Sequence, residues 1–216
     1  MNVYDFPDQF NEEHLSKIYE LIFDRQEQLA QKYTPLEHQN GLRWTQDMPV
    51  NIHDGKGQAQ LKDMAWRTME EIGESLEAWF DDSENVETQN EQLLHAKEEL
   101  ADGLHFLTEL GILSGIKHTD INISLEKVVH QAKEVVSIDE AVTDFVLRLG
   151  ITMNCLKNKP WKCSQYPTDE AKFKKHYLLA YEAYIVLMLE IMEPLEILNL
   201  YFRKSNVNQF RIESKY

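Results

Sequence analysis

The chain has 216 residues, with 37 acidic and 22 basic side chains and a formal net charge of −15 at pH 7. This length suits one domain over residues 1–216, and the excess of acid excludes the broad basic surface that nucleic-acid binding requires. Two cysteines are too few for a disulfide framework, and no apolar run reaches membrane-spanning length without charges. We therefore expect a cytoplasmic protein with neither a nucleic acid nor a membrane as partner.

The first element expected in chain order is a helix over residues 12–33, because apolar side chains recur there at helical spacing. Residues 34–57 follow as a connector that contains several prolines and glycines. A connector of this length often forms a lid or one wall of a pocket. Two helices are then predicted over residues 58–80 and 89–115, and a short polar loop separates them.

The second half of the chain is also expected to be helical. Apolar spacing predicts a short helix over residues 123–137, a helix over 139–157 and a long helix over 169–200, in which Pro194 should produce a kink. The later helix–loop–helix pattern loosely repeats the earlier one, and the alternation typical of strands is scarce. We predict an all-α bundle of two loosely repeated helical hairpins, of which only the first carries an acidic metal site.

Paired acidic residues distinguish the two helices of the first hairpin. Glu71 and Glu74 are three residues apart in its first helix, and Glu99 and Asp102 are three apart in its second. Residues at i and i+3 share one helix face, so antiparallel packing can bring four carboxylates together. Hard cations such as Mg²⁺ prefer oxygen ligands of this kind.

The surroundings of Glu99 and Asp102 strengthen this interpretation. The helix around them is apolar, with Leu94, Leu100, Leu104, Phe106, Leu107, Leu110 and Leu113. Carboxylates rarely enter such surroundings unless they are paired or bind a metal. Acid pairs at this spacing also occur on solvated helices without any function. Two pairs on consecutive helices, one of them in an apolar run, lead us to predict a metal site.

Three sequence patterns together resemble a known superfamily. The acidic helices read EExxE at residues 70–74 and EExxD at 98–102, and the second pattern extends as ELADGLHF over residues 99–106. Residues 201–211 read YFRKSNVNQFR, and the sequence closes on Tyr216. In this order the patterns are similar to those of the all-α NTP pyrophosphohydrolases, which include MazG-like enzymes. The likeness is strongest to the branch of dimeric dUTPases and bacteriophage dCTPase–dUTPases.

The resemblance implies roles for the acidic residues. Glu71, Glu74, Glu99 and Asp102 are expected to bind Mg²⁺, with Mn²⁺ as an alternative ion. Either Glu71 or Glu74 is also expected to orient or deprotonate the attacking water.

The resemblance also implies a pocket for the base. Phe106 is expected to stack on the base, His105 to shape the pocket and Gln26 to read the base edge. Read from the residues alone, a Phe such as Phe106 on an apolar helix is usually a core residue, and a lone His such as His105 is more often a core residue than a ligand. The family pattern has Asn where this chain has Ala30, which weakens the expectation of strict uracil selectivity.

Residues near the C-terminus supply candidate contacts to phosphate and sugar. Lys204 and Arg211 provide local positive charge in an acidic chain, and Arg can fork onto phosphate oxygens. The resemblance adds hydrogen bonds from Asn208 and Tyr216. Without the resemblance, a frayed terminus is the simpler reading of this segment.

We therefore expect Mg²⁺-dependent hydrolysis of a deoxynucleoside triphosphate to the monophosphate and pyrophosphate. The expected substrate is dUTP, and dCTP or a broader range of dNTPs is the alternative. The resemblance further implies a homodimer and, for a phage-encoded chain, the host cytoplasm. Two other classes stay open: a di-iron carboxylate bundle, because Asp102 and His105 have the required i, i+3 spacing, and a non-catalytic module that binds nucleotide or protein.

Overall fold

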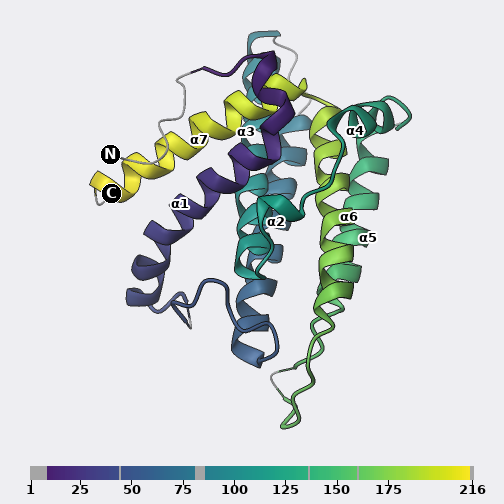
Figure 1. Ribbon diagram of the computed structural model, residues 1–216. Coiled ribbons are helices and arrows are strands. Elements are labelled where there is room, and N and C mark those ends of the chain that lie inside the picture. The colour runs from purple at the N-terminus through teal and green to yellow at the C-terminus, as the bar shows by residue number, and fades with distance from the viewer. Residues whose placement is uncertain (1–8, 44, 81–85, 136, 160, 215–216) are drawn as a thin grey trace.

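The computed structural model describes residues 9–43, 45–80, 86–135, 137–159 and 161–214 (Figure 1). This part of the chain contains helices and no strand, so the all-α prediction is confirmed. Two 3₁₀ turns, Glu12–Lys17 and His118–Asp120, accompany the α-helices. The α-helices are α1 (Ile18–Gln39), α2 (Gly55–Trp79), α3 (Val86–Leu113), α4 (Leu125–Ala132), α5 (Ile138–Met153), α6 (Glu170–Leu189) and α7 (Pro194–Ser214).

The helices pack as two pairs and a crossing layer. Helix α2 packs mainly against α3, and α5 packs mainly against α6. Helices α1 and α7 contact each other and α3, and they lie diagonally beside the pairs in Figure 1. Buried apolar side chains from all of these helices form one continuous cluster. The repetition of one hairpin by the other stays a prediction.

Helix α3 is held by tyrosine hydroxyls from α6. The Tyr184 hydroxyl donates to the backbone oxygen of Leu100 at 2.8 Å, and the Tyr177 hydroxyl donates to that of Leu107 at 3.0 Å. Gly103 and Gly111 permit this approach, because a Cβ at either position would overlap the tyrosine hydroxyl. These contacts fix the position of α3 along its axis and its rotation about that axis, and α3 carries the second acid pair.

Proline positions account for two differences from the predicted helix boundaries. The first helix continues through Pro35 to Gln39 instead of ending at Tyr33, and ion pairs of Glu37 with Arg43 and Arg67 hold its last turns. The predicted kink at Pro194 is a complete break, because α6 ends at Leu189 and α7 begins at Pro194. Proline favours a first helical position, where no amide hydrogen is needed.

Other boundaries differ by a few residues. The predicted helix over residues 123–137 is the shorter α4, and most of the predicted loop between α2 and α3 lies outside the described residues. Along the described helices, none combines the length and the apolar character that crossing a membrane requires.

Candidate active site

Antiparallel packing of α2 on α3 brings three of the predicted carboxylates together. Ser75 of α2 donates to the backbone oxygen of Ala96 at 2.9 Å, which sets the register of the two helices. One turn earlier on α2, Glu71 therefore faces Glu99 and Asp102. One oxygen from each of these carboxylates lies within 4.8 Å of the others. The i, i+3 spacing on α3 and the register with α2 are sufficient to form the cluster.

The carboxylates of this cluster repel one another. Burial raises the pKa of Glu71 to about 8, and a hydrogen bond with Glu99 and the charges of Asp102, Glu99 and Glu74 act in the same direction. Burial also raises the pKa of Asp102, although Lys204 opposes this shift from 2.6 Å. In the absence of a cation, the cluster therefore retains a proton near neutral pH.

The donor set fits a divalent metal ion. The three ligands offer only carboxylate oxygens, which suit Mg²⁺ or Mn²⁺. Glu99 is 8% exposed, and one of its oxygens lies 3.0 Å from His95 Nδ1. A dication would remove the repulsion that raises the pKa of Glu71. Glu74, the fourth predicted ligand, is exposed one turn beyond Glu71 and adds to the local negative charge.

A pocket of about 280 Å³ adjoins the acidic cluster. Helix α3 lines it over successive turns with Asp102, Phe106 and Glu109, and α2 contributes Glu71 and Arg67. Helices α1 and α7 close it from the other side. The full lining consists of Gln26, Leu29, Tyr33, Glu37, Arg67, Glu71, Asp102, His105, Phe106, Glu109, Asn208 and Arg211. One end of the pocket is thus next to the carboxylates, and the other end is next to α1.

Gln26 and His105 are joined at the α1 side of the pocket. Gln26 is 3% exposed, and its carbonyl oxygen accepts from the Tyr201 hydroxyl at 2.9 Å and lies 2.7 Å from His105 Nδ1. Burial lowers the pKa of His105 to about 3, so its ring is neutral and stacks on Tyr201. The amide nitrogen of Gln26 donates to Glu109 at 3.1 Å. These bonds fix the orientation of Gln26.

Three of the C-terminal candidates come close to the acidic cluster and pocket. Asn208 and Arg211 line the pocket from α7, and Lys204 on the same helix pairs with Asp102. Their spacing of three to four residues places them on one helix face. Tyr216 lies outside the described residues.

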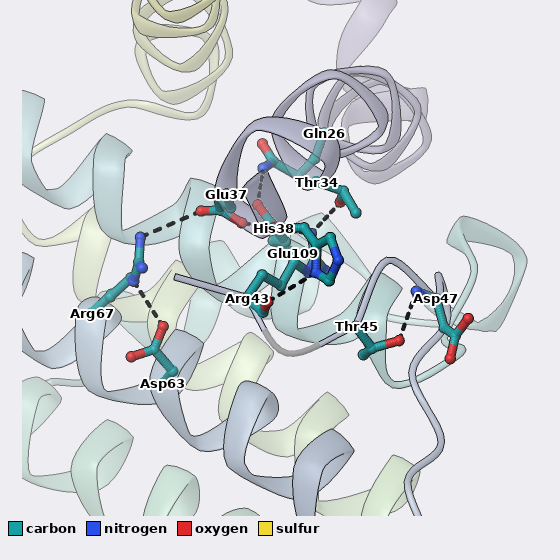
Figure 2. Close-up of polar contacts among 10 residues, drawn as sticks. All are labelled: Gln26, Thr34, Glu37, His38, Arg43, Thr45, Asp47, Asp63, Arg67 and Glu109. Carbon is teal, nitrogen blue, oxygen red and sulfur yellow. Dashed lines mark hydrogen bonds and ion pairs between the residues drawn. The ribbon is translucent and has the colours of Figure 1, made fainter. Parts of the chain in front are cut away.

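Several residues at the base of the pocket were not predicted from the sequence. Figure 2 shows Glu37 between Arg67 and Arg43, and Gln26 pointing to Glu109. For two of them, the sequence distance from a predicted acidic residue could have indicated that they share its helix face. Arg67 precedes Glu71 by one turn, and Glu109 follows Asp102 by two turns. Arg43 and Glu37 gave no such signal, because the connector brings Arg43 back against α1.

Phe106 carries a contact that bears on its predicted stacking role. The guanidinium carbon of Arg67 lies 5.6 Å from the centroid of the Phe106 ring, a cation–π distance. Arg67 is held there by Asp63 at 3.0 Å and by Glu37 at 3.7 Å. A base that stacks on Phe106 must share the ring with Arg67 or displace it.

The chain is an all-helical bundle with acid pairs on two adjacent helices, and a pocket of about 280 Å³ lies beside them. The sequence matches the dUTPase family over residues 68–216, which is more than half of the chain. The chain therefore belongs to the dUTPase family and to its all-α, MazG-related branch. No match was found among curated proteins or solved structures. The matched region contains α3, α7 and the acidic cluster, whereas α1 and Arg43 lie before it.

Proposed function

We propose that this protein hydrolyses a pyrimidine deoxynucleoside triphosphate to the monophosphate and pyrophosphate with the help of Mg²⁺. The observation that supports this most directly is the convergence of Glu71, Glu99 and Asp102 at one end of a pocket. Membership of the dUTPase family favours dUTP, and dCTP is the alternative.

The acidic cluster would hold the metal, with Glu74 as a fourth carboxylate at its rim. A bound Mg²⁺ supplies a Lewis acid and lowers the pKa of a coordinated water. Glu71 or Glu74 accepts the proton of the attacking water as its oxygen bonds to phosphorus and the bond to the leaving phosphate oxygen breaks. The products are a nucleoside monophosphate and pyrophosphate.

The α7 residues would bind the triphosphate. Arg211 lines the pocket and can fork onto phosphate oxygens. Lys204 is paired with Asp102, and it becomes free to contact phosphate once a cation neutralises that carboxylate. Asn208 adds an amide donor from the turn between them, and Tyr216 stays a predicted contact.

The base would lie toward α1. Phe106 offers a ring face for stacking, and His105 holds Gln26 in place from behind. The second amide hydrogen of Gln26 is then available to a carbonyl or ring nitrogen of the base. Because Gln26 is oriented before any ligand arrives, base recognition carries little entropic cost.

The structure disfavours the di-iron alternative. His105 is directed to Gln26 and to the Tyr201 ring, and the carboxylate group found among the described residues includes no histidine. A ferritin-like centre needs histidine ligands that face the metal. A non-catalytic binding role would leave the water-activating carboxylates without a purpose.

The test is pyrophosphate release from a panel of dNTPs and NTPs with Mg²⁺. Wild type is compared with Glu74→Gln and Asp102→Asn, and Glu70→Gln is the matched control. Glu70 is exposed and bonds to Trp66 on its own helix, so its loss should leave the rate unchanged. Pyrimidine dNTP cleavage that both site variants abolish supports the proposal. A wild type that cleaves none of the substrates contradicts it.

We also propose a homodimer. Exposed apolar side chains remain on α5 and α7, among them Leu147, Ile151, Val207 and Phe210. Light scattering on purified protein should give about twice the chain mass of 25.4 kDa. A monomer at micromolar concentration would contradict this proposal without affecting the proposed chemistry.

A further inference from the structure

Glu109 is a buried acid that the proposed reaction does not use. It is 6% exposed, lines the pocket from α3 and accepts one hydrogen bond, from Gln26 to its Oε2, among the described residues. Its Oε1 lies 3.8 Å from Arg43 Nη1, which is beyond hydrogen-bond distance. A carboxylate needs several donors when it leaves water. Glu109 therefore has unused acceptor capacity at the wall of the pocket.

The position of Glu109 along α3 corresponds to the far end of a bound nucleotide. Seven residues separate it from Asp102, which is a rise of ~10 Å along the helix. Phe106 lies between them on the same pocket wall. If the triphosphate binds at Asp102 and the base stacks on Phe106, as proposed above, the edge of the base points toward Glu109.

A second carboxylate lies at this edge, and Arg67 is a cation beside it. Glu37 also lines the pocket, and its Oε2 has no hydrogen-bond partner among the described residues. Gln26 supplies a donor directly beside Glu109. Cytosine presents an amino donor next to the N3 acceptor, which complements an adjacent carboxylate and amide N–H. Uracil presents its O4 acceptor at the position of that amino group, where it would meet a carboxylate.

We propose that Glu109 is the specificity-determining residue for the base: its carboxylate accepts a hydrogen bond from the exocyclic amino group of cytosine and favours dCTP over dUTP. The proposal rests on the proposed function, because it assigns the base preference of the same site, and it places dCTP ahead of the dUTP that family membership favours. It extends the site into the part of the chain that the family match does not cover, since Gln26 and Glu37 both precede residue 68.

The ionisation of Glu109 should tune this preference. Burial and the charge of Glu37 raise its pKa to about 7, and Arg43, Gln26 and Arg67 oppose the shift. Among the described residues, the other titratable groups that interact with Glu109 are Tyr33 of α1 and Tyr201 of α7. The pKa of each tyrosine is raised, so both are neutral between pH 6 and pH 8. A protonated Glu109 can donate to uracil O4. The ratio of dCTP to dUTP cleavage should therefore rise from pH 6 to pH 8.

The experiment compares kcat/KM for dCTP, dUTP and the triphosphate of 2-pyrimidinone deoxyriboside, which lacks only the amino group. In wild type, dCTP should exceed both by about tenfold or more, because an unpaired buried carboxylate penalises a base without the donor. In Glu109→Gln the dCTP preference should fall by about tenfold, and its dependence on pH should disappear. Glu213→Gln, an exposed acid at the end of α7 with a pair to Lys32, is the control and should behave as wild type.

The outcomes separate this inference from the proposed function. No cleavage of any dNTP by wild type would defeat the proposed function itself. Cleavage with a dCTP-to-2-pyrimidinone ratio near one overturns the role of Glu109, and this arm needs no variant, so it stands even where Glu109→Gln fails to fold. A variant that loses activity equally on every substrate shows that Glu109 only balances the charge of Arg43, and it also overturns the inference.

Discussion

The two ends of the pocket differ in how they handle buried charge. At one end, the proposed metal end, Glu71, Glu99 and Asp102 crowd together, and Lys204 and Arg211 oppose the charge of Asp102. At the base end, the acid Glu109 is accompanied by Arg43 and an amide. The acidic cluster therefore has more negative than positive charge, whereas at the other end, the proposed base end, Glu37 and Glu109 lie near two arginines, Arg43 and Arg67, and still have unused hydrogen-bond acceptors. In the proposed function, one helix, α3, therefore carries both an acidic residue at the metal and the residues next to the base.

The largest expected effect comes from the metal end. Asp102→Asn removes a proposed metal ligand and should lower kcat/KM by at least ~100-fold, because the metal is proposed to activate the attacking water. The same change removes a repelling charge, so the melting temperature without metal should not fall. A pyrophosphate assay and a thermal melt measure the two effects. An Asp102→Asn enzyme with wild-type activity would contradict the proposal that the acidic cluster takes part in hydrolysis.

The next effect concerns the phosphate contacts between the two ends. Arg211→Ala should raise KM by ~10-fold or more with a smaller change in kcat, because the proposed forked contact to phosphate is lost. Arg203→Ala is the matched control on the same helix, since Arg203 pairs with Glu98 at a half-exposed site. Steady-state kinetics with the preferred dNTP distinguishes them. Equal effects of both variants would mean that α7 acts only through overall charge.

A packing variant tests whether the metal end depends on the tyrosines behind α3. Gly103→Ala places a methyl group against the Tyr184 hydroxyl and should cost ~1–3 kcal/mol of unfolding free energy. Gly150→Ala on α5 meets open space and should instead stabilise by ~0.5–1 kcal/mol. Urea denaturation measures both. A Gly103→Ala variant that is as stable as the wild type or more stable would contradict the tight contact between α6 and α3.

The smallest expected effect is a pH-dependent response to metal. Glu71 has a raised pKa, so between 4.5 and about 8 the folded chain binds more protons than the unfolded chain. The contribution of Glu71 to stability therefore falls as pH rises through that window. Mg²⁺ binds the deprotonated carboxylates, so it should raise the melting temperature more at pH 8 than at pH 6. A metal-induced shift that does not depend on pH would contradict the crowding of these carboxylates.

The sequence predicted the metal end better than the base end for a physical reason. Glu99 and Asp102 share a helix face by local spacing alone, and Glu71 joins them through one helix pair. The base end is assembled from α1, the connector, α2 and α3. Arg43 is an example of a residue that local sequence patterns do not predict. Its burial depends on the reversal of the chain after α1, and apolar periodicity carries no information on that reversal. The predicted helix boundaries were wrong near two prolines, because Pro35 lies within α1 and Pro194 begins a new helix.

Product analysis tests the central claim most directly. Phosphorus NMR of dUTP and dCTP incubated with the enzyme and Mg²⁺ should show the monophosphate and pyrophosphate as the only products, and chelation of the metal should stop their formation. Nucleoside diphosphate and inorganic phosphate, or intact triphosphate after prolonged incubation, would contradict the assignment of Glu71, Glu99 and Asp102 to a pyrophosphohydrolase site.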